Sequence, residues 1–270
     1  MNYVVQQWLT LAVRWAHVFA AIMWVGQTFF FTWLDHAFTR AASSSEPGGK
    51  QIWMVHSGGF YIVDKQKVPE LLPQKLHWFR WEAAFTWLSG ITLLILVYYT
   101  GGIMVDASVS HMTTLAAVAT SVAMIIFGWL VYDLLWLSPL ARNEVAGAAI
   151  SYVLLVGVIY ASTRIFTGRA AYMQVGAMLG TFMAWNVWVR ILPAQRQLIA
   201  ATKAGLPADM RLADRARQRS KQNTFIVLPV VAIMISNHFP VTTYGNEYNW
   251  VVLSGLVLVG WGVAKLIRSH

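Results

Sequence analysis

The stretch TTLAAVATSVAMIIFGWLVYDLLWL, residues 113–137, decides the fold class because it carries a single charged residue, Asp133. A helix needs about 20 mostly apolar residues to cross the hydrocarbon core of a bilayer. Similar runs recur along the chain and predict an all-α polytopic membrane protein, with about seven transmembrane helices bundled in one domain over residues 1–270. The predicted spans are residues 8–34, 79–100, 113–137, 146–166, 170–192, 224–239 and 249–267.

Composition supports this class. The chain is 57% hydrophobic and 11% charged, with a mean hydropathy of +0.53, whereas soluble domains carry about 25% charged residues. A soluble globule and a disordered chain are therefore excluded. Cysteine is absent, which also excludes disulfides, thiolate metal sites, iron–sulfur clusters and covalently attached c-type haem. Histidine, carboxylates and the backbone are the strong ligands that remain.

The polar segments predict further structure and an orientation. Residues 52–63 (IWMVHSGGFYIV) are typical of a short β-hairpin turning near Ser57-Gly58-Gly59. Residues 193–222 are expected to form a helical hairpin broken at Gly205-Leu206-Pro207. The segments 35–80, 138–145, 190–222 and the C-terminus hold 17 Lys and Arg, and the opposite set holds only two. The positive-inside rule then places the N-terminus outside and the C-terminus and the β-hairpin in the cytoplasm. This asymmetry also explains the net charge of +9 without a nucleic-acid partner.

Histidines in and near the spans are candidate cofactor ligands, because ionisable groups are costly in a membrane. His17 lies well inside the first span and is a candidate axial ligand of a haem. The alternative is a buried histidine bonded to a carbonyl. Arg14, one turn outward, could pair with a haem propionate or extend to the headgroups. His238 at the end of the sixth span could bind haem iron near the outer side, and His77 could serve a second, inner haem.

A second group of polar residues is expected at a common depth near the inner side. Glu82 could act as a general base or form a structural ion pair, and Asp133 is the other candidate base. These two carboxylates, together with Asn186, Arg190, Gln195 and Arg196, could line one pocket open to the cytoplasm. The proposed substrate contacts are Arg80, Trp81, Asn186, Arg190 and Arg196.

Several long motifs resemble the membrane domain of bacterial cytochrome-c-coupled urate oxidases, also called urate hydroxylases. They are RWAHVFAAIMWVG, HSGGFYIVDKQKVPELLPQKLHWFRWEAAFTWLSG, WLVYDLLWLSPL, NVWVRILPAQRQ and RSKQNTFIVLPVVAIMISNHFP, in matching order over nearly the whole chain. The first span is also similar to membrane haem proteins of the protoporphyrinogen-oxidase and copper-resistance types. Those proteins share a His followed by Trp and Gly within about ten residues.

The resemblance implies oxidation of urate to 5-hydroxyisourate in the bacterial inner membrane, with oxygen from water and electrons passed to cytochrome c. Urate is a planar anion, which suits the Arg, Trp and amide side chains of the inner group. The reaction needs a redox cofactor, and non-covalent haem b is the economical candidate. The family commonly continues into a further span and a c-type cytochrome, which this chain lacks. A separate cytochrome c on the outer side is therefore expected, or else a shortened relative whose activity has drifted. Gln222 stands where the family tends to have His.

Two other functions remain open at this point. A non-catalytic haem-b electron-transfer or haem-handling protein would need His17 and His238 but no anion pocket. A transporter of purines or metal ions would use the intramembrane carboxylates without haem. Against a transporter, the sequence has no inverted repeat and no paired spans broken by Gly or Pro.

Overall fold

The helices follow the apolar runs of the sequence. The structure, a computed structural model, describes residues 2–43, 51–66 and 76–269. Within these residues, six helical stretches are long and apolar enough to cross a membrane. They are α1 (Tyr3–Ser43), α2 (Trp81–Leu93) with the π-helical η1 (Leu94–Tyr99), α3 (Thr114–Leu137), α4 (Glu144–Ile165), α5 (Gly168–Trp185) with its continuation to Lys203, and α8 (Asn249–Ser269). The prediction of an all-α membrane bundle is confirmed.

The predicted helical hairpin between the fifth and sixth spans is also confirmed. Helix α5 runs on through the π-helical η3 (Asn186–Ile191) into α6 (Leu192–Lys203), and α7 (Met210–Ser236) returns. The apolar half of α7 corresponds to the predicted span 224–239. Its other half is rich in Arg and Lys, which is why α7 as a whole is not among the six apolar stretches.

Helix α5 lies at the centre of the bundle. Thirteen of its residues are buried, and it packs against α2, α3, α4 and α7. Helix α8 crosses α7 closely, because a Cβ on Gly260 would lie only 2.6 Å from Cδ of Pro229. A short 3-10 segment, η2 (Pro139–Arg142), joins α3 to α4. Core packing therefore holds α3, α4, α5, α7 and α8 together as one unit.

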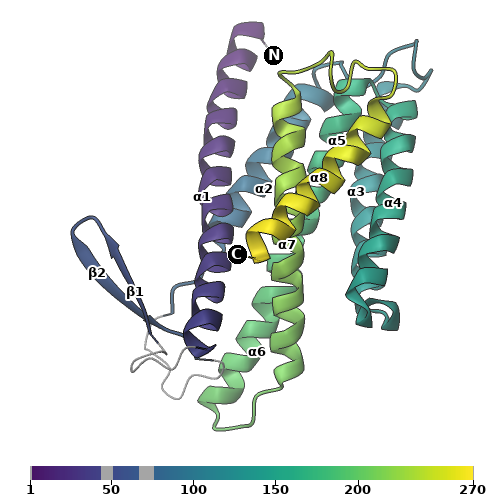
Figure 1. The fold of residues 1–270 in the computed structure, drawn as a ribbon. Helices are drawn as coiled ribbons and strands as arrows, with labels where there is room; N and C mark the ends of the chain where they lie inside the picture. Colours follow the sequence, from purple (N-terminus) through teal and green to yellow (C-terminus); the bar gives the residue numbers. More distant parts are fainter. Residues whose placement is uncertain (1, 44–50, 67–75, 270) are drawn as a thin grey trace.

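Helix α1 stands at the side of this unit and packs mainly on α2 (Figure 1). The Lys- and Arg-rich α6–α7 hairpin, the α3–α4 turn and the β-hairpin lie at the end of the molecule opposite the N-terminus (Figure 1). The predicted sorting of charges to one end is thus present in three dimensions. Which end faces the cytoplasm stays a prediction.

The β-hairpin forms where the sequence predicts it. Strand β1 (Gln51–His56) pairs antiparallel with β2 (Gly59–Asp64), in a register that sets Val55 opposite Phe60. The two-residue turn, Ser57-Gly58, has positive φ at both positions, +50° and +77°. Such a turn matches the natural twist of paired strands and favours glycine.

Candidate functional site: a buried arginine, carboxylate and amide network

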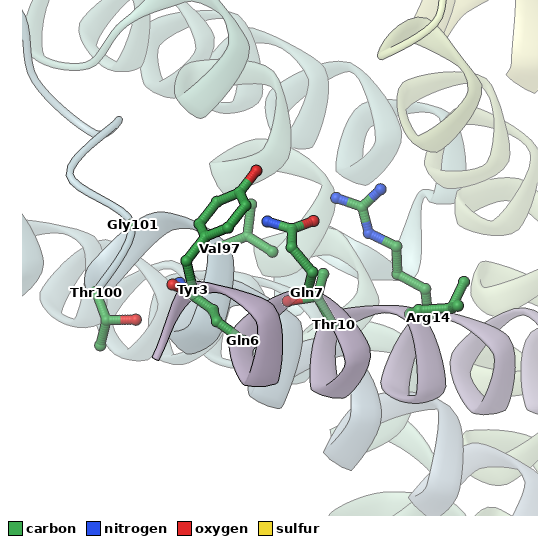
Figure 2. A pocket seen from close by; sticks show the side chains of 9 residues that line it. Tyr3, Gln6, Gln7, Thr10, Arg14, Val97, Thr100 and Gly101 are labelled. Atoms are coloured by element: carbon green, nitrogen blue, oxygen red, sulfur yellow. The ribbon is translucent and has the colours of Figure 1, made fainter. Parts of the chain in front are cut away.

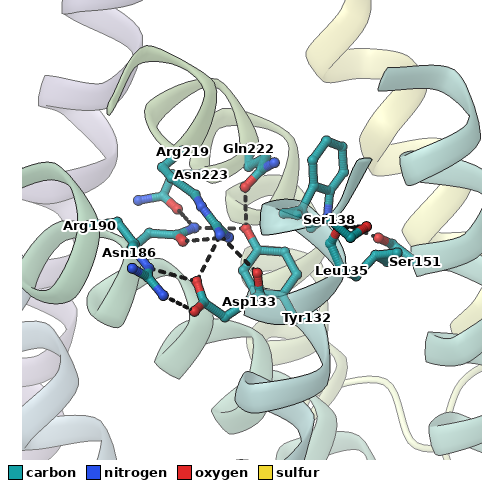
Figure 3. Close-up of polar contacts among 11 residues, drawn as sticks. Tyr132, Asp133, Leu135, Ser138, Ser151, Asn186, Arg190, Arg219, Gln222 and Asn223 are labelled. Carbon is teal, nitrogen blue, oxygen red and sulfur yellow. Dashed lines mark hydrogen bonds and ion pairs between the residues drawn. The ribbon is translucent and has the colours of Figure 1, made fainter. Parts of the chain in front are cut away.

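Asp133 on α3 is bound by two arginines from other helices (Figure 3). Arg190 of η3 donates from Nε to Oδ1 over 2.9 Å, and its Nη2 pairs with Oδ2. Arg219 of α7 donates from Nη2 to Oδ1 over 2.7 Å and to the main-chain oxygen of Asp133 over 3.2 Å. Asp133 is 6% exposed and Arg219 is 3% exposed. The carboxylate is therefore saturated by guanidinium donors inside the protein.

Amide side chains extend this network. Asn186 of η3 donates from Nδ2 to Oη of Tyr132 over 2.9 Å and to Oδ1 of Asn223 over 2.8 Å. Its Oδ1 accepts a longer bond, 3.4 Å, from Nη1 of Arg219. The Tyr132 hydroxyl donates to Oε1 of Gln222. Three helical segments, α3, η3 and α7, thus meet through side-chain hydrogen bonds.

Aromatic rings cover one side of the network. The guanidinium carbon of Arg219 lies 5.1 Å from the centroid of the Tyr132 ring, which is cation–π distance. Tyr132 in turn stacks on Phe182 of α5 at 4.8 Å between centroids. Trp129 contacts both of these rings. The arrangement combines flat apolar surfaces with fixed polar donors.

The network holds more positive than negative charge. Two arginines share one carboxylate, so the group carries a net charge of about +1 if all three are ionised. A buried charge without a counter-ion is unfavourable. Nε2 of Gln222 is also buried, with no hydrogen-bond partner in the described part of the chain. An unbalanced cation beside an unused N–H donor is what a bound anion with carbonyl groups would complement.

Helical spacing brings these side chains together. Arg219, Gln222 and Asn223 lie at i, i+3 and i+4 on α7, so they share one face. Asn186 and Arg190 lie within one turn of the π-helical η3. Segments of π-helix occur frequently at functional sites.

The predicted inner group is brought together only in part. Asp133, Asn186 and Arg190 meet as expected, whereas Arg196 is exposed on α6 and makes none of these hydrogen bonds. Sequence reasoning missed Tyr132, Arg219 and Asn223. The signal that could have found the last two was the polar face at i, i+4 just before the sixth span.

The start of α2 lies beside η3. The Trp81 ring contacts that of Trp188 at 6.1 Å, and Ala83 packs in a small apolar cluster with two residues of the η3–α6 region. Arg80 places its guanidinium carbon 5.3 Å from the Trp81 ring. Among the described residues, Oε2 of Glu82 and Nε of Arg80 are buried without hydrogen-bond partners. Glu82 is therefore a half-buried residue with one buried carboxyl oxygen that has no hydrogen-bond partner among the described residues.

His17 faces α2. Its Nδ1 lies 3.0 Å from the Thr86 carbonyl oxygen and 3.0 Å from Oγ of Ser89. A Cβ on Gly90 would lie 3.1 Å from Cε1 of the ring, so the absence of a side chain there makes room for His17. With Nδ1 donating to the carbonyl, Nε2 presents its lone pair, which is the usual arrangement of a metal-ligating histidine. The surroundings of His17 therefore fit an axial haem ligand. The hydrogen bond between Nδ1 and the Thr86 carbonyl oxygen is equally expected of a structural histidine.

The other candidate ligand residues lie apart from His17. Arg14 is exposed and lines a pocket of about 480 Å³ between α1 and η1. Its side chain extends from the same side of α1 as those of Tyr3 and Gln7 (Figure 2). The His77 ring packs against Phe79 at 4.5 Å, and His238 is exposed just beyond α7. Across residues 2–43, 51–66 and 76–269, no three His or acidic side chains gather as a metal-ion site.

Comparison with known proteins agrees with the resemblance in the sequence. The family model described as "Urate oxidase N-terminal" matches residues 3–269. No curated protein and no solved structure matches the chain. Because the family model covers nearly its whole length, the chain belongs to the urate oxidase N-terminal family.

Proposed function

We propose that this protein is a membrane urate oxidase that converts urate to 5-hydroxyisourate and passes the electrons to a cytochrome c. Membership of the family supports a urate-related oxidoreductase. The reaction balances with water as the oxygen source: one water adds a hydroxyl group to the purine, and two protons and two electrons leave. We place the protein in the bacterial plasma membrane, with the α6–α7 end in the cytoplasm.

The single observation that carries the proposal is the excess positive charge at Asp133. Arg190 is about one-third exposed, so it can reach a ligand while Arg219 stays buried against the carboxylate. A urate monoanion would neutralise the network. Its ring carbonyls suit the free Nε2 of Gln222 and the guanidinium of Arg190, since charge-assisted hydrogen bonds are the stronger ones. Asn186 would act by holding Arg219 and Tyr132 in place.

Glu82 suits the role of general base better than Asp133 does. The oxygens of Asp133 already accept hydrogen bonds from two guanidinium groups, so they are occupied where an attacking water would have to bind. Glu82 keeps one buried oxygen without a partner among the described residues. In the proposed reaction this oxygen takes a proton from the attacking water. Arg80 and Trp81, which precede Glu82 on the chain, would border the bound purine. Arg196 is exposed on α6 and takes part in none of the network's hydrogen bonds, so the proposal gives it no role.

The proposal requires a redox group, because no side chain of this cysteine-free chain accepts two electrons. Haem b held by Nε2 of His17 is the candidate, with Arg14 pairing a propionate and His238 or His77 as further proposed ligands. When bound, haem b would accept electrons one at a time and release them to a cytochrome c on the outer side. Thr86 would hold the His17 ring in the ligating orientation through its carbonyl oxygen.

Binding of urate can be tested separately from turnover. Equilibrium dialysis of the detergent-purified protein with labelled urate should show a dissociation constant at least about tenfold higher for Arg190→Gln, because one charge-assisted bond contributes about 1.5–3 kcal/mol. The control Arg217→Gln removes an exposed arginine of α7 and should bind urate as the unaltered protein does. Equal affinity of all three proteins would contradict the anion site.

Cofactor and turnover need a second experiment. An absorption spectrum recorded without oxygen should show a haem band that becomes reduced when urate is added. His17→Ala should lose the band, whereas His111→Ala, a change in an exposed loop, should keep it. Glu82→Gln should bind urate and haem but reduce haem far more slowly. A band that dithionite reduces and urate does not would favour an electron-transfer protein instead, and well-folded protein without any band would refute the haem proposal.

A further inference from the structure

The β-hairpin exposes an apolar face that no described residue covers. The register places Trp53 opposite Ile62 and Val55 opposite Phe60, and residues alternate between the two faces of a strand. These four side chains therefore share one face, and each is at least half exposed, Phe60 the most at 79%. An isolated two-stranded hairpin is marginally stable in water, so such a face needs a partner.

The position of the hairpin against α1 indicates what the partner is. At its base, Lys65 pairs with Asp35 of α1. Nearer its turn, the hairpin and α1 line one groove of about 570 Å³, to which α1 contributes Phe30 and Trp33. Asp35 and Phe30 are five residues apart, so the groove extends about 7–8 Å from the base of the hairpin along α1 toward the middle of the bundle. In Figure 1 the hairpin slants from the lower end of α1, so that its turn lies level with a more central part of the bundle than the base does, while standing farther out from α1.

The hairpin thus continues the apolar outer surface of a membrane-spanning helix. Phe30 and Trp33 are themselves exposed on α1, where an apolar side chain of a span meets lipid. Strands β1 and β2 contain no Lys or Arg, and their one acidic residue, Asp64, lies at the base. Trp and Tyr, both present in the hairpin, are enriched where a membrane meets water.

We propose that the hairpin is a second membrane anchor, whose Trp53, Val55, Phe60 and Ile62 face rests among the lipids of the leaflet at the α6–α7 end. Its partner is a phospholipid surface, and an acyl chain fills the groove beside Phe30 and Trp33. The unpaired backbone groups at the two strand edges limit its depth to the headgroup boundary, where water and headgroups satisfy them. This inference does not depend on the reaction that the protein catalyses.

The absence of cysteine makes a depth measurement direct, because each introduced cysteine is the only site for a spin label. We would label Phe60→Cys in the full chain in phosphatidylcholine–phosphatidylglycerol vesicles. Collisions with oxygen, which concentrates in lipid, are compared with collisions with a water-soluble nickel chelate. Phe127→Cys, exposed on the membrane-spanning α3, serves as the lipid reference, and Arg217→Cys on α7 as the water reference. Gln51→Cys reports on the base of the same hairpin face.

The label at Phe60 should favour oxygen as the Phe127 label does, and the Gln51 label should lie between the two references. A Phe60 label as accessible to the nickel chelate as the Arg217 label would overturn the proposal. The proposal would also be overturned if the Phe60 label were shielded from both reagents and its spectrum were broadened by a neighbouring spin. A second copy of the chain would then cover this face. Equal accessibility at Gln51 and Phe60 would refute the inclination of the hairpin into the membrane.

Discussion

Replacing Arg219 should destabilise the bundle more than replacing any exposed arginine of the same helix. Arg219→Gln removes two hydrogen bonds to Asp133, a weak one to Asn186 and a cation–π contact with Tyr132. Hydrogen bonds to charged groups contribute about 1.5–3 kcal/mol and an aromatic contact of this kind about 0.5–1 kcal/mol. Asp133 keeps Arg190 as a partner, so the expected loss in free energy of unfolding is about 2–4 kcal/mol.

The measurement is a denaturation curve in mixed micelles for four proteins: the unaltered chain, Arg219→Gln, Asp133→Asn and the double variant. Because the two side chains are in contact, their effects should not add, and the coupling energy should fall at about 0.5–3 kcal/mol. Arg217→Gln is the matched control, and a change at an exposed position should stay within about 0.5 kcal/mol. Additive effects of Arg219→Gln and Asp133→Asn, or an Arg219→Gln curve equal to the control, would refute the ion-pair reasoning.

Two further predictions concern the ends and crossings of α7. Gly260→Ala should lower the melting temperature, because overpacking against Pro229 costs about 1–3 kcal/mol. The control is Gly262→Ala, because a Cβ there would contact no other atom within 4 Å. Equal losses of melting temperature in the two variants would argue against the tight crossing of α7 and α8. At the start of α7, hydrogen bonds from Arg211 lower the pKa of Asp209, which caps the helix. The pKa of the Asp209 carboxyl is lower in the folded protein than in the unfolded chain, where it is about 3.9. The cap therefore stabilises the helix fully above the unfolded pKa. This stabilisation is lost as the pH falls through the lower pKa of the folded state. The protection factors of amides in the first turn of α7, which correct for the intrinsic pH dependence of exchange, should therefore fall on acidification over that range, and the Asp209→Ala variant should lack this fall.

Length and hydropathy are enough to predict the helices, and turn chemistry is enough to predict the hairpin. A run such as residues 113–137 has few alternatives to a membrane helix, and a Ser-Gly pair between two β-branched and aromatic runs favours a tight turn. The depth of Asp133, Asn186 and Arg190 could also be read from the sequence, since each lies a known number of residues from a span end. A common depth permits these side chains to converge but does not decide whether they do.

Rotation about each helix axis is what the sequence does not supply. The sequence places Arg219 among the charged residues of the segment 190–222, and its neighbours Arg217 and Lys221 are exposed or half-exposed. Its own side chain nevertheless turns inward to Asp133. Arg196 carries the same charge as the network arginines, but it lies six residues, or about 9 Å, beyond Arg190 along the same continuous helix and is exposed on α6. Which arginine faces the core depends on the packing of three helices that are distant in sequence, and hydropathy carries no information about that packing.

The π-helical η3 sets the phase between the two halves of the long helix that runs from Gly168 to Lys203. A π turn accommodates one more residue than an α-turn does, and each residue of an α-helix advances the chain by about 100°. Deleting Val189, an exposed residue inside η3, should allow the segment to relax into regular α-helix. Because the π turn already takes up the extra residue, Asn186 and the helix after Ile191 should keep nearly the same direction after the deletion. Arg190 should rotate by much less than the ~100° of one α-helical step. The extra residue of η3 thus changes the local spacing of Asn186 and Arg190 and leaves the face that α6 presents almost unchanged.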